Sequence, residues 1–215
     1  MMKITGIDLS GPRNFADTYL ISFEARGDEI HLINVREGAD DDQILAAISS
    51  LGQKERIVIG IDAPLSYNPT GGDRPSDSGL RRLVHEHGGR VGIMPPTMIR
   101  MVYLSLRGLQ LTRLLELRKP QYTLEIVEVH PGACMILRGA DKDDIRKFKT
   151  ESTARGRLLT WLKTKGLRGF AQIESVSDHY VAACAAALAA WQWSRGKSIW
   201  CYASNPPYHP YDFVC

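Results

Sequence analysis

The chain has few cysteines, no long hydrophobic run and little excess charge, and each shortage excludes a class of protein. Its 215 residues include four cysteines, none of them closely paired along the sequence. Because this spacing offers no disulfide framework, we expect a reducing, intracellular compartment. The least polar segment, residues 180–191, is alanine-rich, and it is shorter than the roughly 20 residues that span a bilayer. The N-terminus has no signal-peptide pattern, so we expect a cytoplasmic protein without a membrane partner.

The charge balance is also close to neutral. Lysine and arginine total 27 and aspartate and glutamate total 24, which gives a net charge of +3. An excess this small is typical of a solvated surface and does not by itself indicate nucleic-acid binding. The composition, 44% hydrophobic and 24% charged, excludes a disordered, collagen-like or coiled-coil chain. The length favours a single domain over residues 1–215.

The predicted secondary structure starts with strands and continues with strands separated by helices. A turn at Gly27-Asp28 separates two alternating segments and predicts an antiparallel hairpin. Strands are predicted at 3–9, 17–24, 29–36, 56–61, 122–129 and 198–203, and helices near 41–51, 77–87, 97–117, 152–165 and 178–195. This order predicts an α/β fold: a mixed sheet that begins with an antiparallel hairpin, continues with parallel strands and carries helices on both faces.

Acidic residues stand where several of these elements end or begin. Asp8, Asp62 and Glu128 lie at or near the ends of three predicted strands, and Asp178 opens the last predicted helix. Ligands of open α/β sheets bind beyond the strand ends, so the four carboxylates are expected to converge at one edge. They would repel one another unless cations lay between them. Oxygen ligands of this kind favour Mg²⁺ or Mn²⁺ over zinc.

Such a site predicts a metal-dependent nuclease or phosphodiesterase. Two divalent ions about 3.5–4 Å apart can activate a water molecule and stabilise the leaving oxygen of a phosphodiester. Two of the acids also have plainer explanations. Asp178 follows Ser177 and suits the first turn of a helix, and Glu128, between Val127 and Val129, suits a solvent-facing strand position.

The order of the motifs resembles a known family. GIDLSG, GIDAPLS, IVEVHPGA and DHYVAACAAALAA are similar, in this order, to segments of the domain-of-unknown-function family 429, whose members are described as predicted nucleases. The resemblance implies a ribonuclease H-like fold, with Asp8 as the ligand shared by both ions. It implies that Asp62 and Glu128 complete the metal shells and that Asp178 is the closing acid. The family favours small or apolar residues where this chain has His179 and Tyr180.

Basic residues extend the resemblance. Arg74, Asp77 and Arg81 have the spacing of a family segment, and Lys149 with Arg157 is similar to another. The resemblance implies that Arg74, Arg81, Lys149 and Arg157 bind the phosphate of a nucleic acid or nucleotide, for which arginine and lysine are suited.

Two other functions fit parts of the sequence. A non-catalytic nucleic-acid or nucleotide-binding module could use the same sheet edge, although a net charge of +3 does not favour strong nonspecific DNA binding. GIDLSG also suggests an actin-like ATP-dependent kinase, but 215 residues leave no room for its second domain and no glycine-rich phosphate loop is present.

Three further polar residues adjoin the acidic positions. Ser10 and Ser66 stand near Asp8 and Asp62 and are expected to cap or hydrogen-bond those carboxylates. His130 either assists proton transfer or occupies the turn before a proline.

Overall fold

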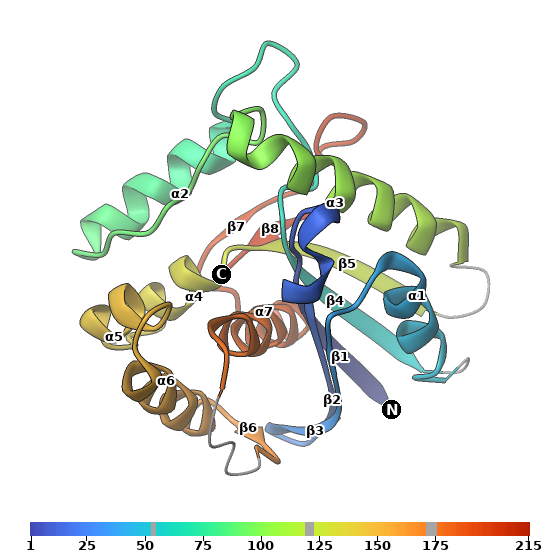
Figure 1. The fold of residues 1–215 in the computed structure, drawn as a ribbon, viewed down its shortest axis with the longest axis vertical. Coiled ribbons are helices and arrows are strands. Elements are labelled where there is room, and N and C mark those ends of the chain that lie inside the picture. Colours follow the sequence, from blue (N-terminus) through green and yellow to red (C-terminus); the bar gives the residue numbers. More distant parts are fainter. Residues whose placement is uncertain (53–54, 119–122, 171–175) are drawn as a thin grey trace.

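The structure is a computed structural model of the chain and describes residues 1–52, 55–118, 123–170 and 176–215. Within these residues eight strands form one mixed sheet in the order β6-β3-β2-β1-β4-β5-β8-β7. A parallel group lies at its centre: β1 (Met2–Asp8), β4 (Arg56–Asp62), β5 (Thr123–Val129) and β8 (Phe213–Val214). The antiparallel strands are β2 (Tyr19–Arg26) and β3 (Glu29–Glu37) on one side and β7 (Cys201–Tyr202) on the other, while β6 (Leu167–Arg168) runs parallel to β3. Figure 1 shows this arrangement.

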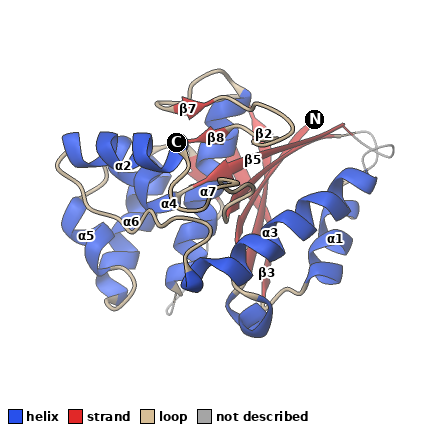
Figure 2. Cartoon of the chain, turned by 90° about the horizontal axis from the view of Figure 1, so that it is seen from above, coloured by secondary structure: helices blue, strands red, loops and turns tan. Residues whose placement is uncertain are grey.

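Helices cover both faces of the sheet. One face carries α1 (Asp41–Ser49) and α3 (Ile99–Arg118), and the other carries α7 (Asp178–Ser194), with α4 (Pro131–Leu137), α5 (Lys142–Lys147) and α6 (Ser152–Thr164) beside it (Figures 1 and 2). α2 (Pro75–Glu86) packs on α4. A 3-10 helix, η1 (Pro12–Asp17), follows β1.

The apolar run of β4 feeds both cores. Ile57 and Ile59 belong to the core beneath α1 and α3, while Val58 between them belongs to the core beneath α7. Successive side chains of a strand point to opposite faces, so a strand buried on both sides needs apolar residues at every position.

Helix α7 lies unusually close to the sheet because two glycines lie beneath it. Gly6 and Gly60 are opposite each other on β1 and β4. A Cβ added to Gly6 would lie 1.9 Å from the carbonyl oxygen of Ala183, and one added to Gly60 would lie 2.5 Å from that of Ala186. The alanine-rich sequence of α7 therefore fits a small-residue surface on the sheet, which fixes where the helix begins.

The expected mixed α/β architecture is confirmed: an antiparallel hairpin leads into parallel strands, with helices on both faces. The turn at Gly27-Asp28 joins β2 to β3, and the 198–203 segment supplies the edge strand β7. The structure adds elements that the sequence did not indicate. Chief among them are α4, which begins directly after β5, and β8, which brings the C-terminal segment beside β5.

No helix in the described parts of the chain is long and apolar enough to cross a membrane. The alanine-rich α7, 17 residues long, is instead the central helix of the core on its side of the sheet.

Candidate active site

Asp8 and Asp62 form a pair of neighbouring carboxyl groups at the ends of adjacent parallel strands. The register of β1 and β4 places the two residues directly opposite each other. Each carboxyl group acts on the pKa of the other. Burial raises the pKa of Asp8, and burial together with the nearby charge of Asp8 raises the pKa of Asp62 well above its ordinary value. Two acids this close cannot both ionise easily, so the pair holds a proton or attracts a cation.

His179 contacts this pair from the start of α7. Ser177 caps the helix by accepting a hydrogen bond from the Tyr180 backbone N–H. His179 stands in this first turn, and its Nδ1 lies 2.7 Å from Asp8 Oδ2. The Asp8 hydrogen bond raises the pKa of His179 above its ordinary value, so the contact with the carboxylate favours the protonated imidazole. No sequence pattern predicts this contact, because it depends on where α7 lies over β1.

Asp178 occupies the first helical position of α7, with Ser177 as the cap. Its side chain is one-quarter exposed and lines the same cavity as Asp8 and Asp62. The expected convergence of acids from separate elements at one sheet edge is therefore present in the structure, with Glu128 also on the cavity lining.

Glu128, however, is engaged by protein groups. It is only 2% exposed, which excludes the solvent-facing alternative. Its Oε2 accepts from the Leu65 backbone N–H and from Arg74, both at 2.8 Å, and its Oε1 accepts from Arg74 at 2.5 Å. A metal bound by Glu128 would have to displace an arginine that already neutralises it, so the geometry does not favour the expected ligand role.

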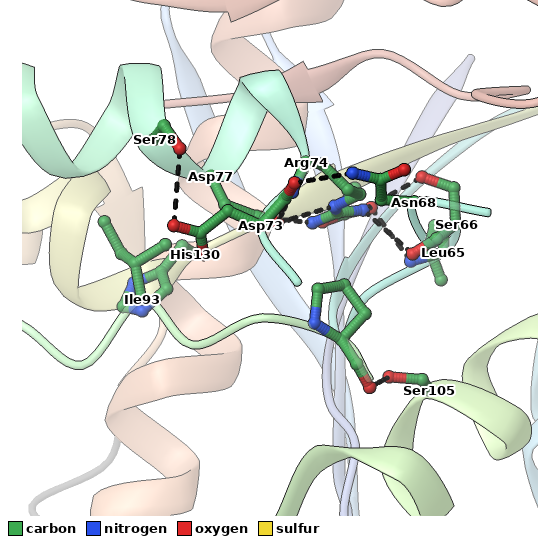
Figure 3. A network of polar contacts seen from close by, with 12 residues as sticks. Leu65, Ser66, Asn68, Asp73, Arg74, Asp77, Ser78, Ile93, Ser105 and His130 are labelled. Carbon is green, nitrogen blue, oxygen red and sulfur yellow. Dashed lines mark hydrogen bonds and ion pairs between the residues drawn. The ribbon is translucent and has the colours of Figure 1, made fainter. Parts of the chain in front are cut away.

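Arg74 is equally committed. Its guanidinium is 5% exposed and donates to Asp77, Ser66 and Glu128, which together use all five of its N–H groups. Figure 3 shows Arg74 between Asp77 on α2 and the residues that follow β4. Because no donor is left, the structure places Arg74 as an internal counter-ion, and this differs from the expected role in phosphate binding.

The other three basic residues divide into two groups. Arg81 donates to Asp73 and to the Ile93 carbonyl, and Arg157 donates to Asp144; neither lines the cavity. Lys149 is exposed and does line it. Its positive charge acts to lower the pKa of Asp62, against the stronger effects of burial and Asp8. Of the four basic residues expected to bind phosphate, Lys149 is the one placed where a ligand could meet it with its charge unpaired.

The cavity that joins these groups has a volume of about 460 Å³. Acids from three elements lie at the sheet edge, and cations from two loops line other parts of the wall, among them Arg90 and Lys149. An apolar wall is formed by Met94, Met101 and Phe148, among others. Cavities of roughly 300–1,000 Å³ with few converging polar groups are typical of small-molecule sites.

The neighbouring polar residues have structural contacts. His130 lines the cavity, caps α4 by accepting at Nδ1 from the Ala133 N–H, and has its pKa lowered by burial. Ser10 bonds Asn14 and Thr18, and Ser66 contacts His209 and Arg74. The expectation that these serines bond Asp8 and Asp62 is therefore not met, because both side chains tie loops together.

The donor chemistry fits a single divalent cation at Asp8 and Asp62. In the described residues no group of three or more histidine, cysteine, aspartate or glutamate side chains is arranged to hold a metal. Mg²⁺ does not require such a cage, because it is commonly held by one or two carboxylates together with water and substrate phosphate. Asp8 and Asp62, opposite each other on β1 and β4, supply these carboxylates.

The fold and site thus define an α/β protein with paired carboxyl groups at the ends of its central parallel strands. The family model described as Protein of unknown function (DUF429) matches residues 6–207. The chain belongs to this family, which confirms the resemblance of its motifs. No curated protein and no solved structure matches the chain.

Proposed function

We propose that this protein is a divalent-metal-dependent phosphodiesterase or nuclease whose centre is the Asp8–Asp62 pair. The observation that carries the proposal is the register of β1 and β4, which places the buried Asp8 and the partly buried Asp62 opposite each other on the wall of one cavity. Such an arrangement is destabilising for an apo protein and is commonly retained at functional sites. The hairpin-first mixed sheet with helices on both faces supports the ribonuclease H-like fold that the family resemblance implies.

Each residue has a separate task in this proposal. Asp8 and Asp62 hold Mg²⁺ or Mn²⁺, which when bound supplies charge stabilisation at the phosphate and lowers the pKa of a water molecule. His179 donates to Asp8 Oδ2 and fixes the orientation of that carboxylate, as hydrogen-bond partners of metal ligands do. Lys149 attracts the substrate phosphate, and Asp178 contributes a further carboxylate at the cavity wall.

Glu128 and Arg74 shape the site from beneath. Glu128 lies on the neighbouring strand β5, opposite Ile61, and its charge acts to raise the pKa of Asp62. An unpaired negative charge there would therefore add to the repulsion at the acid pair. The ion pair with Arg74 limits that repulsion and holds the Leu65 backbone in place. In this way the loop after β4 stays fixed while Asp62 remains free to bind a cation.

The test is hydrolysis of single-stranded, duplex and hybrid nucleic acids, and of a simple phosphodiester, with Mg²⁺ or Mn²⁺. Asp8→Asn and Asp62→Asn are expected to lower the rate at least about 100-fold, as loss of a charge-stabilising group does at other active sites. Asp42→Asn, an exposed acid in the first turn of α1, serves as the control and is expected to keep full activity. Equal rates in all three variants would contradict the proposal.

A binding module without turnover is the second candidate. It is favoured because, in the described residues, no group of three or more histidine, cysteine, aspartate or glutamate side chains is arranged to hold a metal. Salt-dependent binding of single-stranded nucleic acid, unchanged by Asp62→Asn and without hydrolysis in any metal, would support it over a nuclease.

A further inference from the structure

Two exposed cations on the cavity wall are not held in ion pairs by the described residues. Arg90 and Lys149 are exposed and line the cavity, and neither makes a hydrogen bond or ion pair with the part of the chain that the structure describes. By contrast, Arg146 on the same wall is paired with Asp143. Cations left unpaired at a cavity are available to bind an anion.

The segment that carries Arg90 is seated firmly on α4. Gly89 lies so close to Ile136 that an added Cβ would be 2.6 Å from its side chain, and its N–H donates to the Val84 carbonyl. Val91 packs over Gly132: a Cβ added to Gly132 would lie 3.0 Å from the Val91 side chain. Arg90 therefore projects from a backbone held on both sides, which favours a preorganised site over a freely moving surface residue.

Lys149 belongs to a similarly fixed turn between α5 and α6. The preceding Phe148 is buried and lines the cavity, and its carbonyl accepts a hydrogen bond from Arg155. The backbone that carries Arg90 approaches His130, whose Nε2 lies 3.5 Å from the Gly92 carbonyl oxygen, and the charge of Lys149 acts to lower the pKa of the same imidazole. Arg90, Lys149 and His130 all line the same cavity.

The remaining lining residues indicate which chemical group is attached to the bound anion. Met94, Met101, Leu104 and Phe148 provide an apolar surface in a cavity of about 460 Å³. A flat, weakly polar group such as a nucleobase packs well against methionine and aromatic side chains. A volume of this size suits one nucleotide unit and does not admit both strands of a duplex.

We propose that Arg90 and Lys149 form a phosphate-binding subsite that takes one nucleotide unit, with its base on the methionine-rich wall. This inference rests on the proposed function and names its substrate class as a mononucleotide or a single-stranded end. It assigns phosphate binding to Arg90, which no motif indicated, and withdraws it from Arg74, Arg81 and Arg157, whose guanidinium groups are bonded to acids.

The experiment is titration calorimetry in the presence of a chelator, so that no metal and no turnover contribute. The probes are AMP, adenosine, a short 5′-phosphorylated single strand and a blunt duplex, each with the wild-type chain and with Arg90→Gln, Lys149→Gln and Arg82→Gln. Arg82 is exposed on α2 and does not line the cavity, so its variant is the matched control. All three side chains are exposed, and melting curves check that the variants fold.

We expect AMP to bind about 10-fold or more weakly to Arg90→Gln and to Lys149→Gln, as the loss of a charge-assisted hydrogen bond predicts, and equally well to Arg82→Gln and wild type. Adenosine has no phosphate and cannot make these contacts, so its affinity should be the same for the wild type, Arg90→Gln and Lys149→Gln. If the short strand binds as AMP does, the ligand of the subsite is the end of a strand. If AMP binds and the strand does not, the ligand is a free nucleotide. Both results support the subsite.

Binding of AMP that is unchanged in both variants, or absent from the wild type, would overturn the subsite. So would duplex binding as tight as that of the single strand. Failure of the proposed function is a separate result: AMP then binds with the expected dependence on Arg90 and Lys149, while no phosphodiester is hydrolysed with Mg²⁺ or Mn²⁺.

Discussion

Gly6 and Gly60 face each other across β1 and β4, and α7 crosses over both at backbone contact distance. This contact fixes more than packing. Because Asp8 lies two residues after Gly6 on the same strand, the position of α7 decides whether His179 reaches the carboxylate. The small residues of the core and the polar residues of the candidate site are thus linked through one helix.

Replacing Gly6 with alanine is expected to push α7 away from the sheet. The added Cβ would lie 1.9 Å from the Ala183 carbonyl oxygen, and overpacking of this kind costs about 3 kcal/mol or more. Gly11→Ala is the control, because a Cβ there meets nothing within 4 Å and its backbone is extended. Urea unfolding of the two variants measures the difference. Equal midpoints would show that α7 does not contact β1 as described.

Asp62→Asn is expected to stabilise the protein at neutral pH. Burial and the charge of Asp8 hold the folded pKa of Asp62 well above its ordinary value of 3.8, so the folded state binds this proton more tightly than the unfolded state. Stability therefore falls as pH rises from the unfolded pKa through the folded pKa. The amide does not ionise and so avoids that loss, and we expect Asp62→Asn to have a higher free energy of unfolding than the wild type at pH 7.

The same gain should shrink as the pH is lowered, because Asp62 is then protonated in the wild-type protein. Thermal unfolding of wild type, Asp62→Asn and the exposed control Asp42→Asn across the acidic range checks this. A gain that does not depend on pH would mean that the carboxyl group is not the source of the instability.

The His179–Asp8 hydrogen bond is expected to be visible in a histidine titration. The bond raises the pKa of His179 above its ordinary value of 6.5. A histidine whose pKa is raised by folding contributes its full stabilisation at pH values below its pKa in the unfolded state. This stabilisation is lost as the pH rises through the pKa of the folded state. Nuclear magnetic resonance of the imidazole protons in wild type and Asp8→Asn measures the change. We expect the pKa to fall in the variant, and an unchanged pKa would exclude the contact.

Arg74 and Arg81 provide a matched comparison of a buried and an exposed ion pair on one segment of the chain. Arg74→Gln leaves Glu128 and Asp77 buried with no counter-charge, for which we expect a loss of about 3–5 kcal/mol. Arg81→Gln breaks a pair with Asp73 that is partly exposed, so the loss should stay below about 1 kcal/mol. Denaturant unfolding measures both. Similar losses would mean that Glu128 is not held by Arg74.

The sequence predicted the acid pair well because its signal is local. Asp8 and Asp62 each follow an apolar strand, and parallel strands end at the same edge. The partner of Glu128 could not be predicted in this way, since Arg74 is 54 residues away in sequence and reaches it only through the packing of α2. The contact of His179 depends on the glycine-dependent seating of α7.

The elements that were missed have a similar cause. α4 has seven residues and begins with Pro131 and Gly132, so its composition is typical of a turn and its helix is stabilised by burial. β8 pairs with β5 through two residue pairs only, too short a segment for an alternating pattern to emerge.

Divalent metal is expected to stabilise the protein if Asp8 and Asp62 bind it. A ligand that binds the folded state alone contributes about 2.7 kcal/mol at 100 times its dissociation constant, which for a chain of this size corresponds to a rise in Tm of roughly 5–10 °C. We expect this rise with Mg²⁺ or Mn²⁺ in the wild type and in Asp42→Asn, and its loss in Asp8→Asn and Asp62→Asn. Sodium chloride at equal ionic strength separates binding from charge screening.

Because the apo pair is destabilised by its own repulsion, the cation relieves the same free energy that Asp62→Asn removes. The two effects should therefore not add, and a Tm of Asp62→Asn that still rises with metal as much as the wild type would place the cation elsewhere.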